Sequence, residues 1–159
     1  MTNEPPAETA NACALTGHRE LEENFDSADF KKAIRRLIEQ KGVNVFYCGM
    51  ALGFDMRACA YLLRLKGKFP QVKVVACIPC PQQSDTFPLQ AKREYDRLVA
   101  RCDEKVVIAE HYSPGCMLAR NRYMVDRAAY LIAYLRKETG GTAYTVRYAE
   151  KKGVEITYL

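Results

Sequence analysis

The chain has 159 residues, of which 48% are hydrophobic and 27% charged, and its formal net charge is +5. These values are ordinary for a soluble globular protein, and no apolar run approaches the roughly 20 residues that a membrane-spanning helix needs. The mild positive charge permits anionic ligands, including nucleotides and nucleic acid, but requires none. We predict a frayed arm over residues 1–10 and a single domain over 11–159. Because the start lacks a signal-peptide pattern, we expect a cytoplasmic location.

Strand-like and helix-like segments alternate along the whole chain. Strands are predicted at 12–17, 43–48, 72–78, 104–110, 129–135 and 154–159, and helices at 26–42, 54–67, 89–102, 115–128 and 142–153. No hairpin signal joins two strands, and the strands are continuous apolar runs, which is typical of strands covered on both faces. The pattern predicts an α/β fold: a Rossmann-like, doubly wound, mostly parallel sheet of about six strands with helices on both faces.

The seven cysteines do not form a recognisable disulfide framework. Cys77 and Cys80 have CxxC spacing, but a zinc site would need a second pair, and the nearby prolines delay the helix on which a redox motif would sit. We therefore interpret the cysteines as structural and predict no metal site.

The unusual residues fall in the loops that follow the strands: "TGHRE", "GMALGFD", "PCPQQSDTF", "HYSPGC" and "RKETGGT". In a parallel sheet all these loops emerge at the carboxyl edge, where ligands of open α/β sheets bind. The return loops, such as "KGKFPQ", are plain turns. This asymmetry predicts a polar ligand site at the carboxyl edge.

The first of these loops contains Thr16, Gly17, His18 and Arg19. Gly17 allows close approach of the backbone to a ligand, and the Arg19 guanidinium suits a phosphate or carboxylate. Thr16 offers a hydroxyl. His18 has three readings that the sequence leaves open: ligand binding, acid–base chemistry, or capping of a backbone group.

In "CGMALGFD", Gly49 and Gly53 precede the second helix, where backbone amides and the helix dipole favour an anion. Asp55 lies in the first turn of that helix. The dipole alone explains an acid there, but its position beside the buried stripe also suits a hydrogen bond from a ribose. Both interpretations stay open.

The helix at 115–128 places Asn121 on the same stripe as Met117 and Met124. A buried amide must be paired, so Asn121 either ties down a neighbouring loop, such as the one at Gly49, or contacts a ligand. Arg120 borders this stripe near the ligand-facing end, and we predict that it contacts a phosphate.

A second glycine-rich helix start follows the fifth strand at Gly140, Gly141 and Thr142. Its amides and the Thr142 hydroxyl are predicted to form an anion-binding nest. Tyr112 and Ser113, after the fourth strand, are predicted to supply a stacking face and a hydroxyl.

The segments "LTGHRE", "FYCGMALGFDMRACA", "GCMLARNRYMVDRA" and "GGTAYTVRYAEKKG" together resemble the YpsA/YoqJ-like proteins of the SLOG superfamily, over about residues 12–158. That superfamily also holds the cytokinin-activating phosphoribohydrolases, also called lysine decarboxylase-like proteins, and the DNA-processing protein Smf. The resemblance implies a Rossmann-like fold and a nucleotide or nucleotide-derived ligand, but no known reaction.

The chain departs from the phosphoribohydrolases at the residue that acts on the N-glycosidic bond. Their motif carries a Glu where this chain has Thr145. Weak candidates for an acid or base are Asp55 and Glu110.

Three hypotheses about function follow from the sequence. The chain binds or senses a small anionic ligand derived from a nucleotide, it is an enzyme acting on a nucleoside phosphate or an ADP-ribose-like substrate, or it binds single-stranded nucleic acid. The third is disfavoured because basic residues are scattered rather than gathered with aromatic residues along one groove. Met and Tyr residues suit either a homo-oligomer interface or the core. No cofactor is expected beyond a bound nucleotide, and no membrane partner is expected.

Overall fold

The computed structural model describes residues 9–159, and these form one six-stranded sheet with helices on both faces. The strands are β1 (Ala12–Gly17), β2 (Val45–Cys48), β3 (Lys73–Ile78), β4 (Glu104–Val107), β5 (Tyr130–Tyr134) and β6 (Glu155–Tyr158). The helices are α1 (Ser27–Lys41), α2 (Phe54–Leu65), α3 (Leu89–Arg101), α4 (Cys116–Asp126) and α5 (Gly141–Lys151). The predicted alternation of strands and helices is therefore confirmed.

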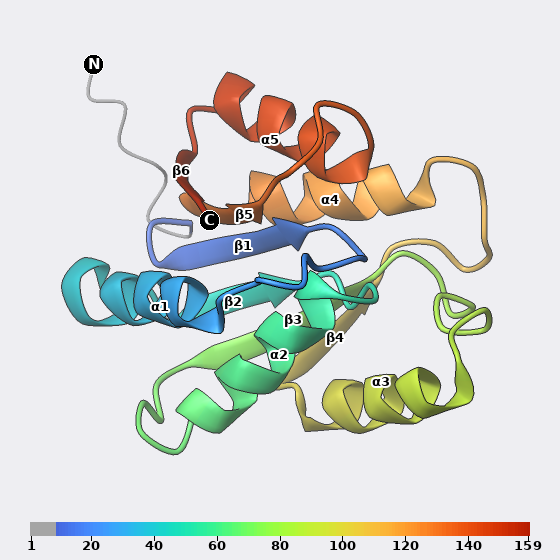
Figure 1. Cartoon of the computed structure of the whole chain (residues 1–159), viewed down its shortest axis with the longest axis horizontal. Coiled ribbons are helices and arrows are strands. Elements are labelled where there is room, and N and C mark those ends of the chain that lie inside the picture. Colours follow the sequence, from blue (N-terminus) through green and yellow to red (C-terminus); the bar gives the residue numbers. More distant parts are fainter. Residues whose placement is uncertain (1–8) are drawn as a thin grey trace.

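All the strand pairs are parallel, and the strand order is β4-β3-β2-β1-β5-β6. The chain moves outward from β1 to β4 through α1, α2 and α3, which cover one face (Figure 1). It then crosses back through α4 to β5, beside β1, and α4 and α5 cover the other face. The predicted doubly wound, Rossmann-like α/β sheet is confirmed, with its topological switch point between β1 and β5.

Two apolar cores lie on the two faces of the sheet. The larger core contains Phe46 from β2, Ile34 from α1 and Leu62 from α2, and the second contains Leu131 from β5 and Val146 from α5. Successive residues of one strand pack alternately into the two cores, because successive side chains point to opposite faces. This explains why the strands read as continuous apolar runs in the sequence.

The fourth strand is shorter than predicted. The apolar run suggested a strand over 104–110, whereas β4 ends at Val107. Its neighbour β3 ends at Ile78 and is followed by Pro79, which has no backbone N–H to donate to a continuing ladder. The regular ladder therefore ends at Val107, although the amides of Ile108 and Ala109 still donate to the carbonyl oxygens of Ile78 and Pro79 at 2.9 and 3.1 Å.

Residues 1–8 of the predicted N-terminal arm lie outside the described residues. The carbonyl of Thr9 accepts hydrogen bonds from the amides of Ala12 and Ala129. This contact places residue 9 beside the amino-terminal ends of β1 and β5, away from the carboxyl edge.

Candidate ligand-binding site

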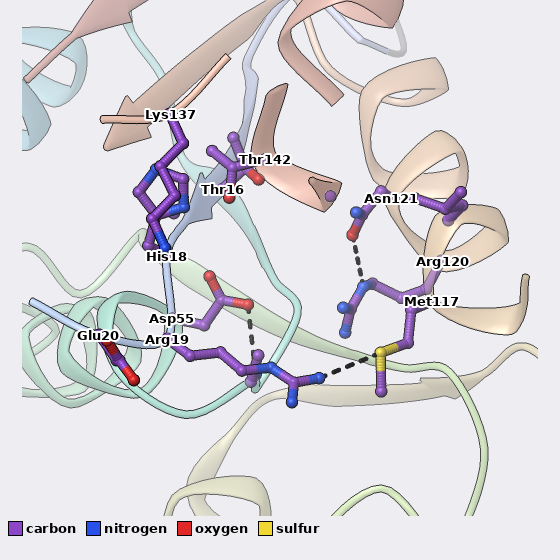
Figure 2. Close-up of a pocket in the computed structure, with 14 residues that line it drawn as sticks. Thr16, His18, Arg19, Glu20, Asp55, Met117, Arg120, Asn121, Lys137 and Thr142 are labelled. Atoms are coloured by element: carbon purple, nitrogen blue, oxygen red, sulfur yellow. Dashed lines mark hydrogen bonds between the residues drawn. The ribbon is translucent and has the colours of Figure 1, made fainter. Parts of the chain in front are cut away.

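A pocket of about 510 Å³ opens at the carboxyl edge of the sheet, where the chain leaves β1 and β5 toward opposite faces (Figure 2). Its volume falls within the range of small-molecule sites. It is lined by Thr16, Gly17, His18, Arg19, Glu20, Ala51, Asp55, Met117, Leu118, Arg120, Asn121, Lys137, Gly141 and Thr142. Open α/β sheets bind their ligands at such a switch point.

The pocket brings together many of the residues singled out in the sequence: Thr16, Gly17, His18, Arg19, Asp55, Arg120, Asn121, Gly141 and Thr142. Sequence reasoning missed Glu20, Ala51, Met117, Leu118 and Lys137 as lining residues. A signal for Lys137 was present, because it lies in one of the five loops at the carboxyl edge. Met117 was interpreted only as part of a buried stripe.

Three residues of the loop between β4 and α4 do not line the pocket. Tyr112 is 65% exposed, and Ser113 and Glu110 are also exposed. The cause is the strand order, since β4 is an edge strand with β3 and β2 between it and β1. Neighbouring strands are about 4.8 Å apart, so this loop emerges well away from the switch point. Glu110 is accordingly not a candidate acid or base for this pocket.

Gly49, Gly53 and Gly140 do not line the pocket either. Gly53 instead allows a close contact between the loop before α2 and the β1–α1 loop. Its φ is +83°, and a Cβ built on it would lie 2.1 Å from the Arg19 carbonyl oxygen. The amide of Phe54 donates to the carbonyl oxygen of His18 at 3.2 Å. The first amide of α2 is therefore used by the β1–α1 loop, and Gly53 allows the two loops to touch.

Gly17, the last residue of β1, also allows this close contact. A Cβ on Gly17 would lie 2.4 Å from Cδ1 of Phe54. The sequence predicted that Gly17 approaches a ligand, and it does line the pocket, but the space that its missing side chain leaves is filled by the Phe54 ring.

Arg120 is 4% exposed and is held by the protein itself. Its Nη1 donates to the carbonyl oxygens of Gly49 and, at 3.4 Å, Cys77, and its Nε donates to Oδ1 of Asn121 at 2.7 Å. The side chain of Gln83 also donates to the Gly49 carbonyl, at 2.9 Å. Arg120 thus joins α4 to the ends of β2 and β3, and Asn121 reaches the Gly49 loop through it.

Asp55 is the other buried charged residue of the pocket, with 5% exposure. Its Oδ2 accepts a hydrogen bond from the amide of Ala51 at 3.2 Å. Its Oδ1 is the one buried side-chain polar atom in residues 9–159 that has no hydrogen-bond partner. Burial raises the pKa of the Asp55 carboxyl to about 6, although the nearby charge of Arg120 and the Ala51 amide both favour ionisation.

His18 caps a backbone group, one of the readings that the sequence left open. Its Nε2 accepts a hydrogen bond from the amide of Arg136 at 2.8 Å, which ties the β1–α1 loop to the end of β5. Burial, followed by the charges of Lys137 and Arg136, lowers the pKa of the imidazole. We therefore expect a neutral His18 at pH 7, acting as a wall of the pocket.

Helix α5 begins at the pocket. Its N-cap is Gly140, with φ of +97° and no side chain that caps the helix, and Gly141 and the buried Thr142 line the pocket directly. The first amides of a helix have no partner within the helix, and the dipole gives this end a partial positive charge. Arg19 and Lys137 line the same pocket, so the positive end of α5 and two cationic side chains share it.

No group of three His, Cys, Asp or Glu side chains that could hold a metal ion occurs in residues 9–159. The seven cysteines are free, and Cys77 and Cys80 are both buried. Helices α1 to α5 are all too short or too polar to cross a membrane.

The fold and this pocket define a Rossmann-like α/β protein with a pocket at its switch point. A family model described as the YspA SLOG family, YpsA, matches residues 14–159, and the chain belongs to that family. A similar relative is the uncharacterized SPbeta prophage-derived protein YoqJ of Bacillus subtilis (strain 168), 29% identical over 130 residues, which are 74% of this chain and 76% of YoqJ. A UPF0398 protein of Bacillus thuringiensis (strain Al Hakam) is 22% identical over 152 residues, 88% of this chain and 83% of that protein.

Two solved structures share the fold. DNA processing protein A from Helicobacter pylori, described for its single-stranded DNA binding mode, superposes with a TM-score of 0.67 and 20% identity over 94% of this chain. DNA processing protein A from Streptococcus pneumoniae gives a TM-score of 0.63 and 21% identity over 92% of this chain. This chain spans 65% and 49% of those two solved chains. The identities are low, so the likeness is one of fold.

Proposed function

We propose that the chain binds a nucleotide or nucleotide-derived ligand in the switch-point pocket. The observation that carries this proposal is that the start of α5, Arg19 and Lys137 all line one pocket. Helix N-termini bind phosphate through their amides, and cationic side chains add charge-assisted hydrogen bonds. The phosphate is assigned to Gly141 and Thr142, with Arg19 and Lys137 closing over it.

Arg120 was predicted to contact the phosphate, and we assign it a supporting role instead. Its Nε and Nη1 already donate to protein oxygens, so of its three nitrogens only Nη2 is left to contact a ligand. Its charge still favours an anion in the pocket. Arg19, by contrast, has only a weak contact with the sulfur of Met117, at 3.4 Å, and is free to turn toward a ligand.

Binding without turnover is favoured over N-glycosidic hydrolysis. At the position of the phosphoribohydrolase Glu, Thr145 is buried and its hydroxyl donates to the Gly141 carbonyl at 2.7 Å. This hydroxyl closes a local turn of α5 and offers no carboxylate to the pocket. Asp55 is the remaining acid among the residues once considered catalytic.

A second candidate, binding of single-stranded DNA, is favoured by the fold that this chain shares with DNA processing protein A of Helicobacter pylori. Such binding depends strongly on salt and needs a groove long enough for several nucleotides. The pocket, at about 510 Å³, suits a single nucleotide better than a strand.

The test is isothermal titration calorimetry with the four common nucleoside 5′-monophosphates. We expect at least one of them to bind. The double variant Arg19→Ala/Lys137→Ala should weaken its binding by about 100-fold or more, because each charge-assisted hydrogen bond contributes roughly 1.5–3 kcal/mol. The matched control is Arg35→Ala, which removes a partly exposed arginine of α1 that pairs with Glu39 and should leave binding unchanged.

Equal affinity of the double variant and the unchanged protein would remove Arg19 and Lys137 from the site. If no mononucleotide binds but an oligo(dT) strand binds in a salt-dependent manner, the second candidate replaces the first.

A further inference from the structure

The unpartnered oxygen of Asp55 indicates what else the ligand must carry. Of the buried side-chain polar atoms in the described part of the chain, only Oδ1 of Asp55 has no partner, and Asp55 lines the pocket. Leaving a buried acceptor unsatisfied costs about 1–3 kcal/mol, and more for a charged one. Oδ2 is already occupied by the Ala51 amide, which fixes the orientation of the carboxylate.

The geometry points to a ligand that donates a hydroxyl hydrogen bond to Oδ1 of Asp55 while its phosphate lies at α5: a ribose phosphate with its vicinal hydroxyls intact. This inference rests on the proposed function, because it takes the position of the phosphate from it. Asp55 would then select a nucleotide that carries the hydroxyl it binds, at C2′ or C3′, over the analogue that lacks that hydroxyl.

The donor must be a neutral group. Arg120 and Arg19 both place positive charge near Asp55, which disfavours a cationic partner. A metal ion would need further ligands, and the described residues offer no group of three. A hydroxyl or amide N–H meets neither obstacle.

We expect the hydroxyl to lie near the phosphate, because two side chains, Arg120 and Asn121, connect the surroundings of Asp55 to the start of α5. One point, the Cβ position on Gly49, lies 2.9 Å from both Oδ2 of Asp55 and Cζ of Arg120. Nε of Arg120 donates a hydrogen bond to Oδ1 of Asn121, and Nδ2 of Asn121 lies 4.0 Å from the Cβ position on Gly141. In a nucleoside 5′-monophosphate the groups next to the phosphate are the sugar hydroxyls, whereas the base lies further away. Figure 2 shows Asp55, Arg120 and Asn121 around the same opening.

The experiment compares, by calorimetry, the best-binding ribonucleoside 5′-monophosphate with its 2′-deoxy and 3′-deoxy analogues. We expect at least one analogue to bind about 10- to 100-fold more weakly to the unchanged protein, because a site built to hydrogen-bond a hydroxyl rejects a ligand that lacks it. In Asp55→Asn the preference should shrink to a few-fold at most, because a charge-assisted hydrogen bond from the hydroxyl is replaced by a weaker neutral one from the NH₂ group to the hydroxyl oxygen. The Ala51 amide needs an acceptor, so the asparagine oxygen takes that place and its NH₂ group, a donor, faces the ligand.

The matched control is Arg19→Ala, which should weaken all three ligands alike and leave the preference intact. If both deoxy analogues bind the unchanged protein as tightly as the ribonucleotide, the role of Asp55 is overturned while the proposed function stands. If no mononucleotide binds, the proposed function itself fails. The comparison in the unchanged protein decides the question even if Asp55→Asn does not fold.

Discussion

Gly53→Ala is expected to lower the free energy of unfolding by roughly 3 kcal/mol or more, because its Cβ position makes the shortest contact of any glycine in the described residues. The added Cβ would lie 2.1 Å from the carbonyl oxygen of Arg19 and 2.7 Å from that of His18. Both contacts are with backbone, so no side chain can turn aside. In addition, φ of +83° with ψ of −120° is a conformation that only glycine adopts readily. Urea unfolding followed by circular dichroism measures the loss.

The matched control is Gly42→Ala at the end of α1. Gly42 also has a positive φ, +69°, but no atom lies within 4 Å of its Cβ position. Its substitution should cost only the backbone strain, about 1 kcal/mol. A Gly53→Ala chain that does not fold while Gly42→Ala does would lead to the same conclusion. Equal losses in the two variants would mean that the loops after β1 and β2 do not touch as described.

Arg120→Ala is expected to destabilise the protein by about 3–5 kcal/mol, the usual cost of removing one member of a buried charged network. The substitution leaves the carbonyl oxygens of Gly49 and Cys77 without this donor. It also removes the positive charge that stabilises the ionised carboxylate of the buried Asp55. The pKa of Asp55 should rise further above its ordinary value. The free energy of unfolding in urea at pH 7.5, where the ionised form is costly, measures the effect.

The control for this substitution is Arg122→Ala on the same helix. Arg122 is half-buried and donates one hydrogen bond to the Tyr144 hydroxyl at 3.0 Å, so its loss should cost about 1 kcal/mol. Adding Asp55→Asn to Arg120→Ala should recover part of the lost stability, because the uncompensated charge is removed. If Arg120→Ala costs no more than Arg122→Ala, or if the double substitution is simply additive, Arg120 and Asp55 are not coupled.

The sequence was sufficient to predict the sheet because its signals are local. Continuous apolar runs mark each strand, and the start of α1 is marked by Asp26, whose side chain accepts from the Ala28 amide at 2.8 Å. The carboxyl-edge rule then placed Gly17, Asp55 and Thr142 at one edge before any strand order was known. That reasoning needs only that the strands are parallel.

The parts that were missed depend on contacts between distant segments. The predicted site included Tyr112 and Ser113 because strand order cannot be read from alternation alone, and β4 turned out to be an edge strand. The contacts by which Arg120 joins α4 to the ends of β2 and β3 were missed because its acceptors, the carbonyls of Gly49 and Cys77, are backbone groups that carry no residue-type signal. Gly53 was interpreted as part of an anion-binding helix start. In the structure the backbone of Arg19 occupies the space that a side chain at this position would need.

The proposed function requires a phosphate at the start of α5, between the side chains of Arg19 and Lys137. The most direct test is an NMR titration of the ¹⁵N-labelled protein with the mononucleotide that binds best, following the backbone amide signals. We expect the amides of Gly141 and Thr142 to show the largest shifts, with Arg19 next and all three reaching saturation together. Unchanged Gly141 and Thr142 amides at saturating ligand, with the shifts concentrated instead around Tyr112 and α3, would contradict it.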